Sequence, residues 1–486
     1  MSSTSESFLL ERYREIALLE SVQGVLHWDM ETKMPKQGTD LRGRQLGLMA
    51  SLIHGKETES RYVEEALKLQ NSPHARPLRR RLLNTLCVDT AFVARLSEAQ
   101  VQCQNLWKKA RQAKDFSIVS PALQGLVDLQ REWAQRYKAH PAATPEVKSL
   151  SNFEACLGLF EPGFPAQKLD ALLNELGPAL KTRVPSVVAK QGAARDTLTL
   201  AMPIEEQQIL VQRVCKDLGF DFNHGRLDES AHPFCGGSPE DTRLTVRYDE
   251  RDFTNAVTST THETGHAIYE QNLPAELLYT PVGVAASYGV HESQSRFLEN
   301  QIGRSQPFAN YLAKITGRDA GLLYSHLNRV KNSFIRVDAD EVTYNLHIMI
   351  RVGIEKKLLN GEMNADEIPA AWNAAYADYL GLKVPDDGVG CLQDIHWYGG
   401  SFGYFATYTL GNLIAAALFQ DFQKLNPIWE AQVSSGDFSA IRNFCKDRVH
   451  RHAALHDSPG TIQLALGREL TAKPFLEYVD HKYLGK

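Results

Sequence analysis

Apolar residues recur at three- and four-residue steps over most of this 486-residue chain, a pattern typical of amphipathic helices. The clearest example is 6–30, where one helical face collects Phe8, Leu9, Tyr13, Ile16 and Leu19. The same periodicity predicts helices within 75–138 with a break near 115–121, and then at 166–180, 293–302, 323–354 and 365–380. Pro178 and Pro185 are expected to segment the chain beyond 180.

Alternation with a period of two is convincing in only two stretches, 198–202 and 242–248. In the second, Leu244, Val246 and Tyr248 fall on one face of a predicted strand. A strand with a free edge can bind an extended peptide backbone, so this strand is a candidate for substrate contact. The predicted fold class is therefore mostly α, an elongated helical body with a small β-sheet.

The chain shows no internal repeat, low-complexity tract or linker. We therefore treat 1–486 as a single domain, with a mainly helical N-terminal part over 1–200. The second part, 201–486, contains the candidate chemistry described below.

Composition excludes several classes of partner. Hydrophobic residues make up 43% and charged residues 23%, and the net charge of -5 gives no basic surface for nucleic acid or an anionic membrane. No apolar run approaches the ~18 residues of a membrane span, and the first residues lack a secretory signal pattern. The seven cysteines include no C-x-x-C pair, which predicts reduced thiols and a cytoplasmic location.

The segment 262–266 reads H-E-x-x-H and lies in a proline-free stretch. On a helix, His262 and His266 share one face, so both imidazoles can reach one zinc ion at ~2.0–2.1 Å. Glu263 is then placed to take a proton from water at the open metal position. A catalytic zinc site needs a third protein ligand, and the downstream candidates are His291 and Glu292.

Six segments match, in order, the motif series of the carboxypeptidase Taq family of metallocarboxypeptidases. They are HPF at 232–234, DTRLT at 241–245, HETGH at 262–266, HESQ at 291–294, IRVDAD at 335–340 and GCLQDIHW at 390–397. The stretch WDMETKMP at 28–35 is also similar to that family. The resemblance thus covers nearly the whole chain.

The resemblance implies a mostly helical, deeply grooved zincin fold, usually a homodimer, with one Zn²⁺, or sometimes Co²⁺, per chain. It also implies Glu292 as the third ligand, whereas His291 on a helix would point roughly 100° away from it. Many members of the wider class place an aspartate four residues after the ligand glutamate to support a histidine. Here that position is Arg296, so the supporting partner must come from elsewhere.

The same motifs suggest residues that bind the substrate. A carboxypeptidase needs a cation for the free carboxylate of its peptide, and the family motif points to Arg336. A structural salt bridge with Asp338, Asp340 or Glu341 is the alternative role for this arginine. His232 and Arg243 are further substrate-binding candidates.

Negative charge that develops on the scissile carbonyl oxygen requires a hydrogen-bond donor. We expect His396 and Tyr408 to serve as donors, with Tyr404 as the substitute for Tyr408. The predicted reaction is metal-dependent removal of single residues from the free C-terminus of peptides, with Glu263 as general base and then general acid. An endo-oligopeptidase on the same fold and a non-catalytic helical interaction protein are the alternatives, which blocked peptides and metal content would distinguish.

Overall fold

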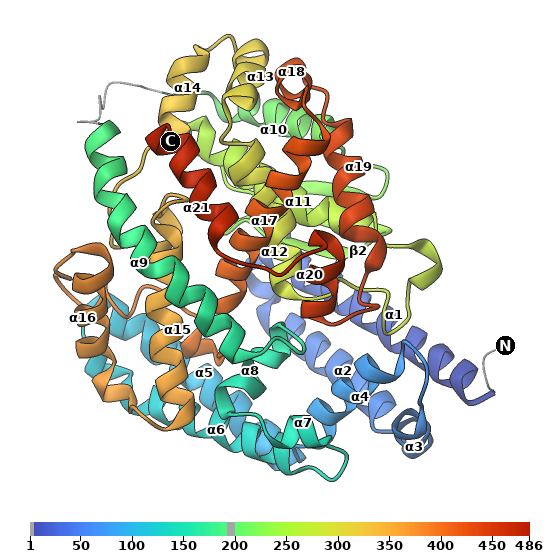
Figure 1. The fold of residues 1–486 in the computed structure, drawn as a ribbon. Coiled ribbons are helices and arrows are strands. Elements are labelled where there is room, and N and C mark those ends of the chain that lie inside the picture. The colour runs from blue at the N-terminus through green and yellow to red at the C-terminus, as the bar shows by residue number, and fades with distance from the viewer. Residues whose placement is uncertain (1–3, 192–199) are drawn as a thin grey trace. The chain divides into compact units, whose positions relative to one another are not determined.

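The structure, a computed structural model, describes residues 4–191 and 200–486. Helices make up most of this part of the chain, as the periodicity predicted, and they are accompanied by one three-stranded sheet (Figure 1). The chain divides into two compact units, each built from three segments. The division does not follow a boundary near residue 200, because the N-terminal segment belongs to the same unit as the H-E-x-x-H helix.

Unit 1 comprises Met1–Leu82, Ala194–Asn328 and Gly411–Leu470. Its helices are α1 (Thr4–Thr32), α2 (Thr39–Glu57), α3 (Ser60–Lys68), most of α4 (Ala75–Leu86), α10 (Ile204–Leu218), α11 (Phe253–Gln271), α12 (Tyr288–Arg296), α13 (Gln306–Thr316), α14 (Ala320–Leu327), most of α17 (Ala406–Leu425), α18 (Trp429–Ser435), α19 (Ser439–Arg448) and α20 (Ser458–Leu466). A π-helical segment, Phe297–Ile302, continues α12 directly.

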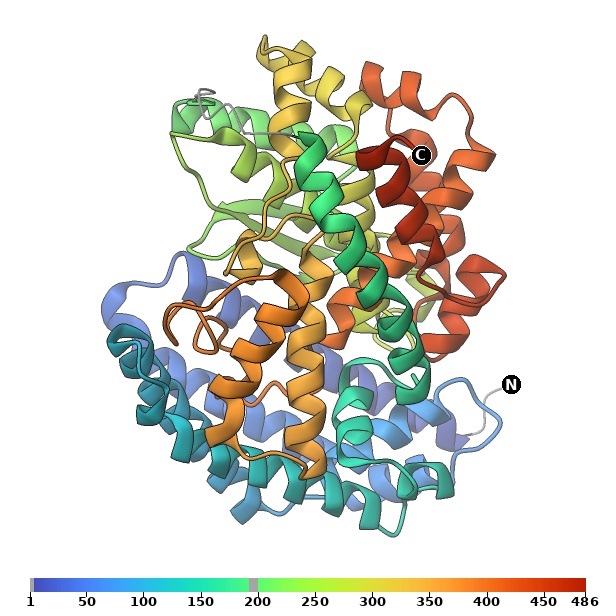
Figure 2. The ribbon, with the colours of Figure 1, turned by 60° about the vertical axis from the view of Figure 1, so that its left-hand side comes forward.

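Unit 2 comprises Leu83–Ala193, Arg329–Leu410 and Thr471–Lys486. Its helices are α5 (Thr90–Ala113), α6 (Ser120–Ala139), α7 (Pro145–Lys148), α8 (Asn152–Phe160), α9 (Ala166–Gln191), α15 (Tyr344–Asn360), α16 (Ile368–Leu380) and α21 (Lys473–Val479). Figure 2 shows α9, in green, beside α15, in light orange. No helix in the described ranges is long and apolar enough to cross a membrane.

The sheet lies in unit 1 and has the strand order β1-β3-β2. β1 (Gly225–Glu229) pairs parallel to β3 (Asp241–Val246), and β2 (Cys235–Ser238) pairs antiparallel to it. Leu244 of β3 is fully buried and packs with Cys215 of α10 and Ala267 of α11. The expectation that this strand has a free edge is therefore wrong, because β3 is the central strand and the outer edges belong to β1 and β2.

The other predicted strand lies only partly in the described chain. Leu198 and Thr199 are outside the described residues, and Leu200 forms an isolated bridge with Asp252. Tyr248 lies beyond the end of β3.

Two helix predictions fail for identifiable reasons. The helix α9 runs through Pro178 and Pro185, because burial of apolar side chains along its length outweighs the lost backbone hydrogen bonds. The predicted helix 323–354 is interrupted between α14 and α15. There Asp340 accepts hydrogen bonds from the backbone amides of Lys331, Val342 and Thr343, which stabilises an irregular loop in competition with a helix.

Candidate metal centre and a buried arginine cluster

The H-E-x-x-H segment lies on α11, as predicted. The helix begins after Asp252, whose carboxylate accepts the amide hydrogen of Thr254 and so caps the first turn. Burial of one face of α11 against the sheet and α10 leaves His262 and His266 on the face that meets α12. Their rings are 4.9 Å apart.

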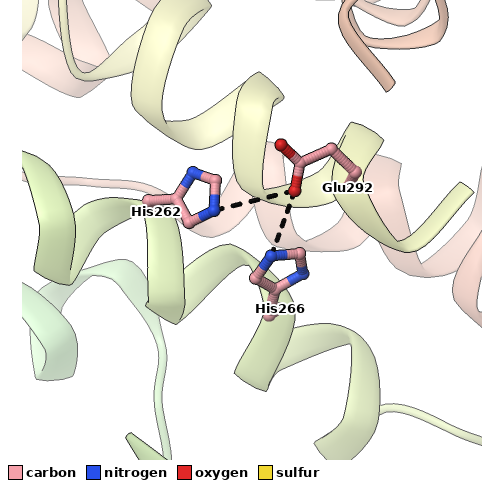
Figure 3. Close-up of side chains that lie close together, drawn as sticks. All are labelled: His262, His266 and Glu292. Atoms are coloured by element: carbon pink, nitrogen blue, oxygen red, sulfur yellow. Dashed lines mark ion pairs between the residues drawn. The ribbon is translucent and has the colours of Figure 1, made fainter. Parts of the chain in front are cut away.

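Glu292 on α12 completes a group of three possible metal ligands (Figure 3). Its Oε2 is 3.3 Å from His266 Nε2 and 3.7 Å from His262 Nε2. One ligand atom from each residue lies within 4.8 Å of the other two. The helices approach closely because residue 265 is glycine, where an added Cβ would lie 2.5 Å from the backbone of Gln294 and Ser295.

Glu299 is the supporting partner that sequence reasoning did not name. Its Oε2 accepts from His262 Nδ1 at 2.8 Å, which leaves the Nε2 lone pair of that histidine toward Glu292. Arg296 bonds both Glu292 at 2.6 Å and Glu299 at 3.1 Å, so it joins the two carboxylates. Glu299 follows Glu292 by two helical turns, and that spacing was a usable signal in the sequence.

His291, the competing ligand candidate, points elsewhere. Its Nε2 lies 2.8 Å from Glu270 Oε1, and its ring stacks on His266 with 4.5 Å between centroids. Within the described residues, His266 Nδ1 has no hydrogen-bond partner. The orientation of His266 therefore depends on this stacking, whereas that of His262 depends on Glu299.

Burial and charge set the protonation states of the centre. Burial raises the pKa of Glu263 to about 7, although His262 opposes the shift. Burial also lowers the pKa of His266 to about 3, which keeps its imidazole neutral and able to ligate. Burial alone would raise the pKa of Glu292, but the charges of Arg296 and His262 outweigh this effect and hold that pKa well below its usual range.

In unit 2, Arg336 lies in a short 3₁₀ turn, Arg336–Asp338, and is only 6% exposed. Its Nε and Nη2 donate to Asp394 Oδ1 at 3.0 and 2.8 Å, and its Nη1 donates to the Tyr344 hydroxyl at 2.8 Å. Its ion-pair partner is therefore Asp394, 58 residues away, and not one of the nearby acidic residues considered from the sequence.

A second arginine shares the same carboxylate. Arg351 is fully buried and donates to Asp394 Oδ2 at 2.6 Å and to Gln393 Oε1 at 2.7 Å. The Arg336 backbone amide also donates to Gln393 Oε1 at 2.8 Å. The structure thus joins the segments 335–340 and 390–397, which the sequence had presented as separate motifs. We call Arg336, Arg351 and Asp394 the arginine cluster.

The aromatic candidates gather beside this cluster in unit 2. His396 Nε2 is 3.3 Å from the Tyr408 hydroxyl, and Tyr404 and Tyr408 pack edge to face at 5.3 Å. The Arg336 guanidinium lies 5.1 Å from the centroid of the Tyr408 ring. Burial and the charge of Arg336 lower the pKa of His396 to about 4, so this imidazole is neutral at pH 7.

The last two candidates lie in unit 1. His232 is exposed in the loop between β1 and β2. Arg243 on β3 forms two hydrogen bonds with Asp241, at 2.9 and 2.8 Å, and lies 4.2 Å from the centroid of the Trp28 ring. Arg226 of β1 lies 4.8 Å from the same ring. The contacts of Arg243 are thus those of a side chain that holds α1 against the sheet.

Comparison with known proteins places these observations in one family. The sequence model of the carboxypeptidase Taq (M32) metallopeptidases matches residues 8–483. Thermostable carboxypeptidase 1 of Thermus thermophilus is 36% identical over 98% of this chain and 97% of that protein, and carboxypeptidase 1 of Bacillus subtilis is 35% identical over 99% and 98%.

Solved structures of carboxypeptidases are similar to this chain over nearly its whole length. Metallocarboxypeptidase 1 of Trypanosoma cruzi is similar with a TM-score of 0.94 and 31% identity, covering 99% of this chain and 100% of that chain. An M32 carboxypeptidase from Deinococcus radiodurans gives a TM-score of 0.91 at 34% identity, covering 99% of both chains.

Proposed function

Because the chain belongs to the carboxypeptidase Taq (M32) metallopeptidase family, it is a metal-dependent carboxypeptidase that acts on peptides, and we propose which of its side chains hold the metal and the substrate. The observation that carries the proposal is the convergence of His262, His266 and Glu292 from two helices. Two imidazole nitrogens and a carboxylate oxygen are a typical donor set of catalytic zinc sites. When bound, a divalent ion supplies Lewis acidity that acidifies water and polarises a carbonyl.

Glu263 is the proposed general base. It directly follows His262 on α11 and is buried, and burial raises the pKa of its carboxyl group, which favours uptake of a proton. In the proposed reaction Glu263 accepts a proton from the attacking water and passes it to the leaving amine. Glu299 and Arg296 support the ligands by fixing the orientation of His262 and Glu292.

The arginine cluster is the proposed site for the free carboxylate of the peptide. Two guanidinium groups share the single carboxylate of Asp394, so the cluster carries one positive charge in excess. The pKa of both His347 and His396 is lowered, so neither imidazole adds to this charge at neutral pH. An uncompensated buried charge is costly, and a substrate carboxylate would neutralise it.

Arg336 is the member of the cluster best able to make this contact. Both arginines use three N–H donors in the bonds described here, but Arg336 retains some exposure to solvent, whereas Arg351 has none. All three of the Arg351 donors bond to protein groups, including the backbone carbonyl of His347 at 2.6 Å. We therefore assign the substrate carboxylate to Arg336 and a supporting role to Arg351.

His396 and Tyr408 are the proposed donors to the carbonyl oxygen of the scissile bond, and each such donor contributes ~2.7–4 kcal/mol. Support comes from the neutral state of His396 and from its Nδ1, which is buried without a partner in the described chain. Tyr404 is the alternative phenol. His232 and Arg243 are proposed to contact more distant parts of the peptide, although Arg243 already has partners in Asp241 and Trp28.

We also propose Zn²⁺ as the metal, one ion per chain with Co²⁺ as a substitute, a homodimeric assembly and a cytoplasmic location. The seven cysteines are all free thiols, which suits a reducing compartment. Elemental analysis of the purified protein and light scattering test the first two points. A disulfide found in the native protein would contradict the third.

One experiment separates the carboxypeptidase from an endopeptidase that uses the same metal site. The enzyme is given two peptides of one sequence, one with a free C-terminus and one with a C-terminal amide, and released amino acid is followed by mass spectrometry. We expect stepwise loss of C-terminal residues from the free peptide alone. Internal cleavage of both peptides at equal rates would contradict the proposal.

A further inference from the structure

A buried carboxyl group holds both ends of the turn that lies between His396 and Tyr404. Glu355 on α15 is 0% exposed. Its Oε1 accepts hydrogen bonds from the indole Nε1 of Trp397 at 3.2 Å and from the backbone amide of Gly403 at 2.8 Å. Trp397 directly follows His396, and Gly403 directly precedes Tyr404. One oxygen atom therefore fixes the start and the end of the turn 397–403.

The C-terminal end of the turn lies directly against α8. Gly403 has a φ of +86°, and a Cβ on it would lie 2.5 Å from the carbonyl carbon of Cys156 on α8. The chain at this point therefore requires glycine and lies directly against the α8 backbone. The buried Gly403 amide is satisfied by Glu355, and without that acceptor it would lose its hydrogen bond.

The carboxyl group of Glu355 forms no ion pair among the described residues, and its Oε2 has no hydrogen-bond partner there. An uncompensated carboxyl group in the interior is unfavourable. An apolar side chain of similar size would fill the same space without this cost, but it would leave two donors unsatisfied. The role that the structure indicates for Glu355 is therefore its contact with the turn.

We propose that Glu355 is a positioning residue for the carboxypeptidase reaction, which holds the 397–403 turn and thereby the relative placement of His396, Tyr404 and Tyr408. The inference rests on the proposed roles of His396 and Tyr408 as donors to the scissile carbonyl. Glu355 itself lies behind the turn and touches it through Trp397 and Gly403, so its effect on the reaction is indirect.

The protonation state of Glu355 makes the test specific. Burial raises its pKa to about 8, while the bonds from Gly403 and Trp397 oppose the shift. The carboxyl group is thus mostly neutral at pH 7, and glutamine reproduces its shape and its accepting oxygen. Methionine fills the same space without an acceptor. Glu355→Gln should rescue what Glu355→Met loses.

The experiment measures kcat, KM and bound metal at pH 7 for the parent, both Glu355 variants and Ile350→Ala. The control removes a buried side chain that lies about 140° around α15 from Glu355. We expect Glu355→Met to lose about 10- to 100-fold in kcat, with KM and metal content retained, because small displacements of reacting groups have effects of this size. Glu355→Gln should remain within about 3-fold of the parent.

Several results would overturn the inference: unchanged kcat in Glu355→Met, an equal loss in Ile350→Ala, or no rescue by Glu355→Gln. Should Glu355→Met fail to fold, Trp397→Phe can be tested instead. It removes one of the two donors to Glu355 and should lower kcat without changing KM or metal content. His396→Ala and Tyr408→Phe test the proposed carbonyl donors independently of the positioning role of Glu355. If both keep full kcat, the proposed donors are wrong and the inference falls with them, whereas a loss in both but not in Glu355→Met refutes the inference alone.

Discussion

The candidate metal centre in unit 1 and the arginine cluster in unit 2 are both groups of polar side chains, but each lacks a different kind of partner. At the candidate metal centre, a nitrogen of His262, a nitrogen of His266 and an oxygen of Glu292 converge, and each can offer a lone pair to a cation. At the arginine cluster, donors outnumber acceptors, because two guanidinium groups share the carboxylate of Asp394. The first arrangement is suited to a cation and the second to an anion.

The two sites also differ in how locally they are built. The three candidate ligands come from two consecutive helices, and Arg296 ends the second of them while Glu299 lies in the π-helical segment that follows. The arginine cluster needs Asp394, which lies 58 residues after Arg336, with the helices α15 and α16 between them in the chain. Spacing alone singled out His262 and His266, whereas it gave no sign that Asp394 pairs with Arg336.

The largest effect is expected from removal of a candidate metal ligand, which should abolish cation binding in unit 1. Glu292→Ala is expected to lose the metal and all measurable activity, because two histidines leave the site open on two sides. His291→Ala, the matched control on the adjacent position, should keep about one metal ion per chain. Elemental analysis after gel filtration measures both. The reverse result would mean that His291 is the ligand.

Removal of the general base should leave the metal centre intact and stop its chemistry. Glu263→Gln retains the shape of the side chain but cannot accept a proton from water, so we expect a loss of ~10²–10⁴ in kcat with metal content unchanged. Steady-state kinetics together with metal analysis provide the measurement. Activity close to that of the parent would exclude Glu263 from this role.

Removal of Arg336 should affect only substrates that carry the matching charge. Arg336→Ala is expected to lose about 10- to 200-fold in kcat/KM on peptides with a free carboxylate. The same peptide with a C-terminal amide, a poor substrate for the parent, should be affected much less. Equal losses on the two peptides would show that Arg336 supports the fold, and Arg243 or His232 would then be tested as the carboxylate-binding residue.

The smallest effect is expected where a residue orients a ligand without touching the metal. Glu299→Gln keeps an acceptor for His262 Nδ1 but loses the charge that joins Arg296 and Arg304 to the centre. Metal affinity should fall by about 10- to 100-fold, measured by competition with a chelator. His262 would have to be oriented by another group if affinity stayed at the parent value.

The features of this structure that depend on local sequence pattern could be predicted. The helices, the placement of His262 and His266 on one face of α11 and the family relationship followed from spacing and motifs. The central place of β3 did not, because strand order depends on which distant segments pair. The sequence also did not predict that α9 continues through two prolines, because tertiary packing there outweighs the local tendency of proline to end a helix. Glu299 was missed although its spacing from Glu292 was visible.

The tight contact at Gly265 has a consequence for engineering the enzyme. A side chain on Gly265 would collide with the backbone of α12, and one on Gly411 would lie 2.5 Å from Glu292 Cγ. Randomised libraries at these two positions should therefore return almost only glycine. Substitutions that retune metal preference will have to be sought at Arg296 or Glu299, which contact the ligands through side chains and leave the spacing between the helices unchanged.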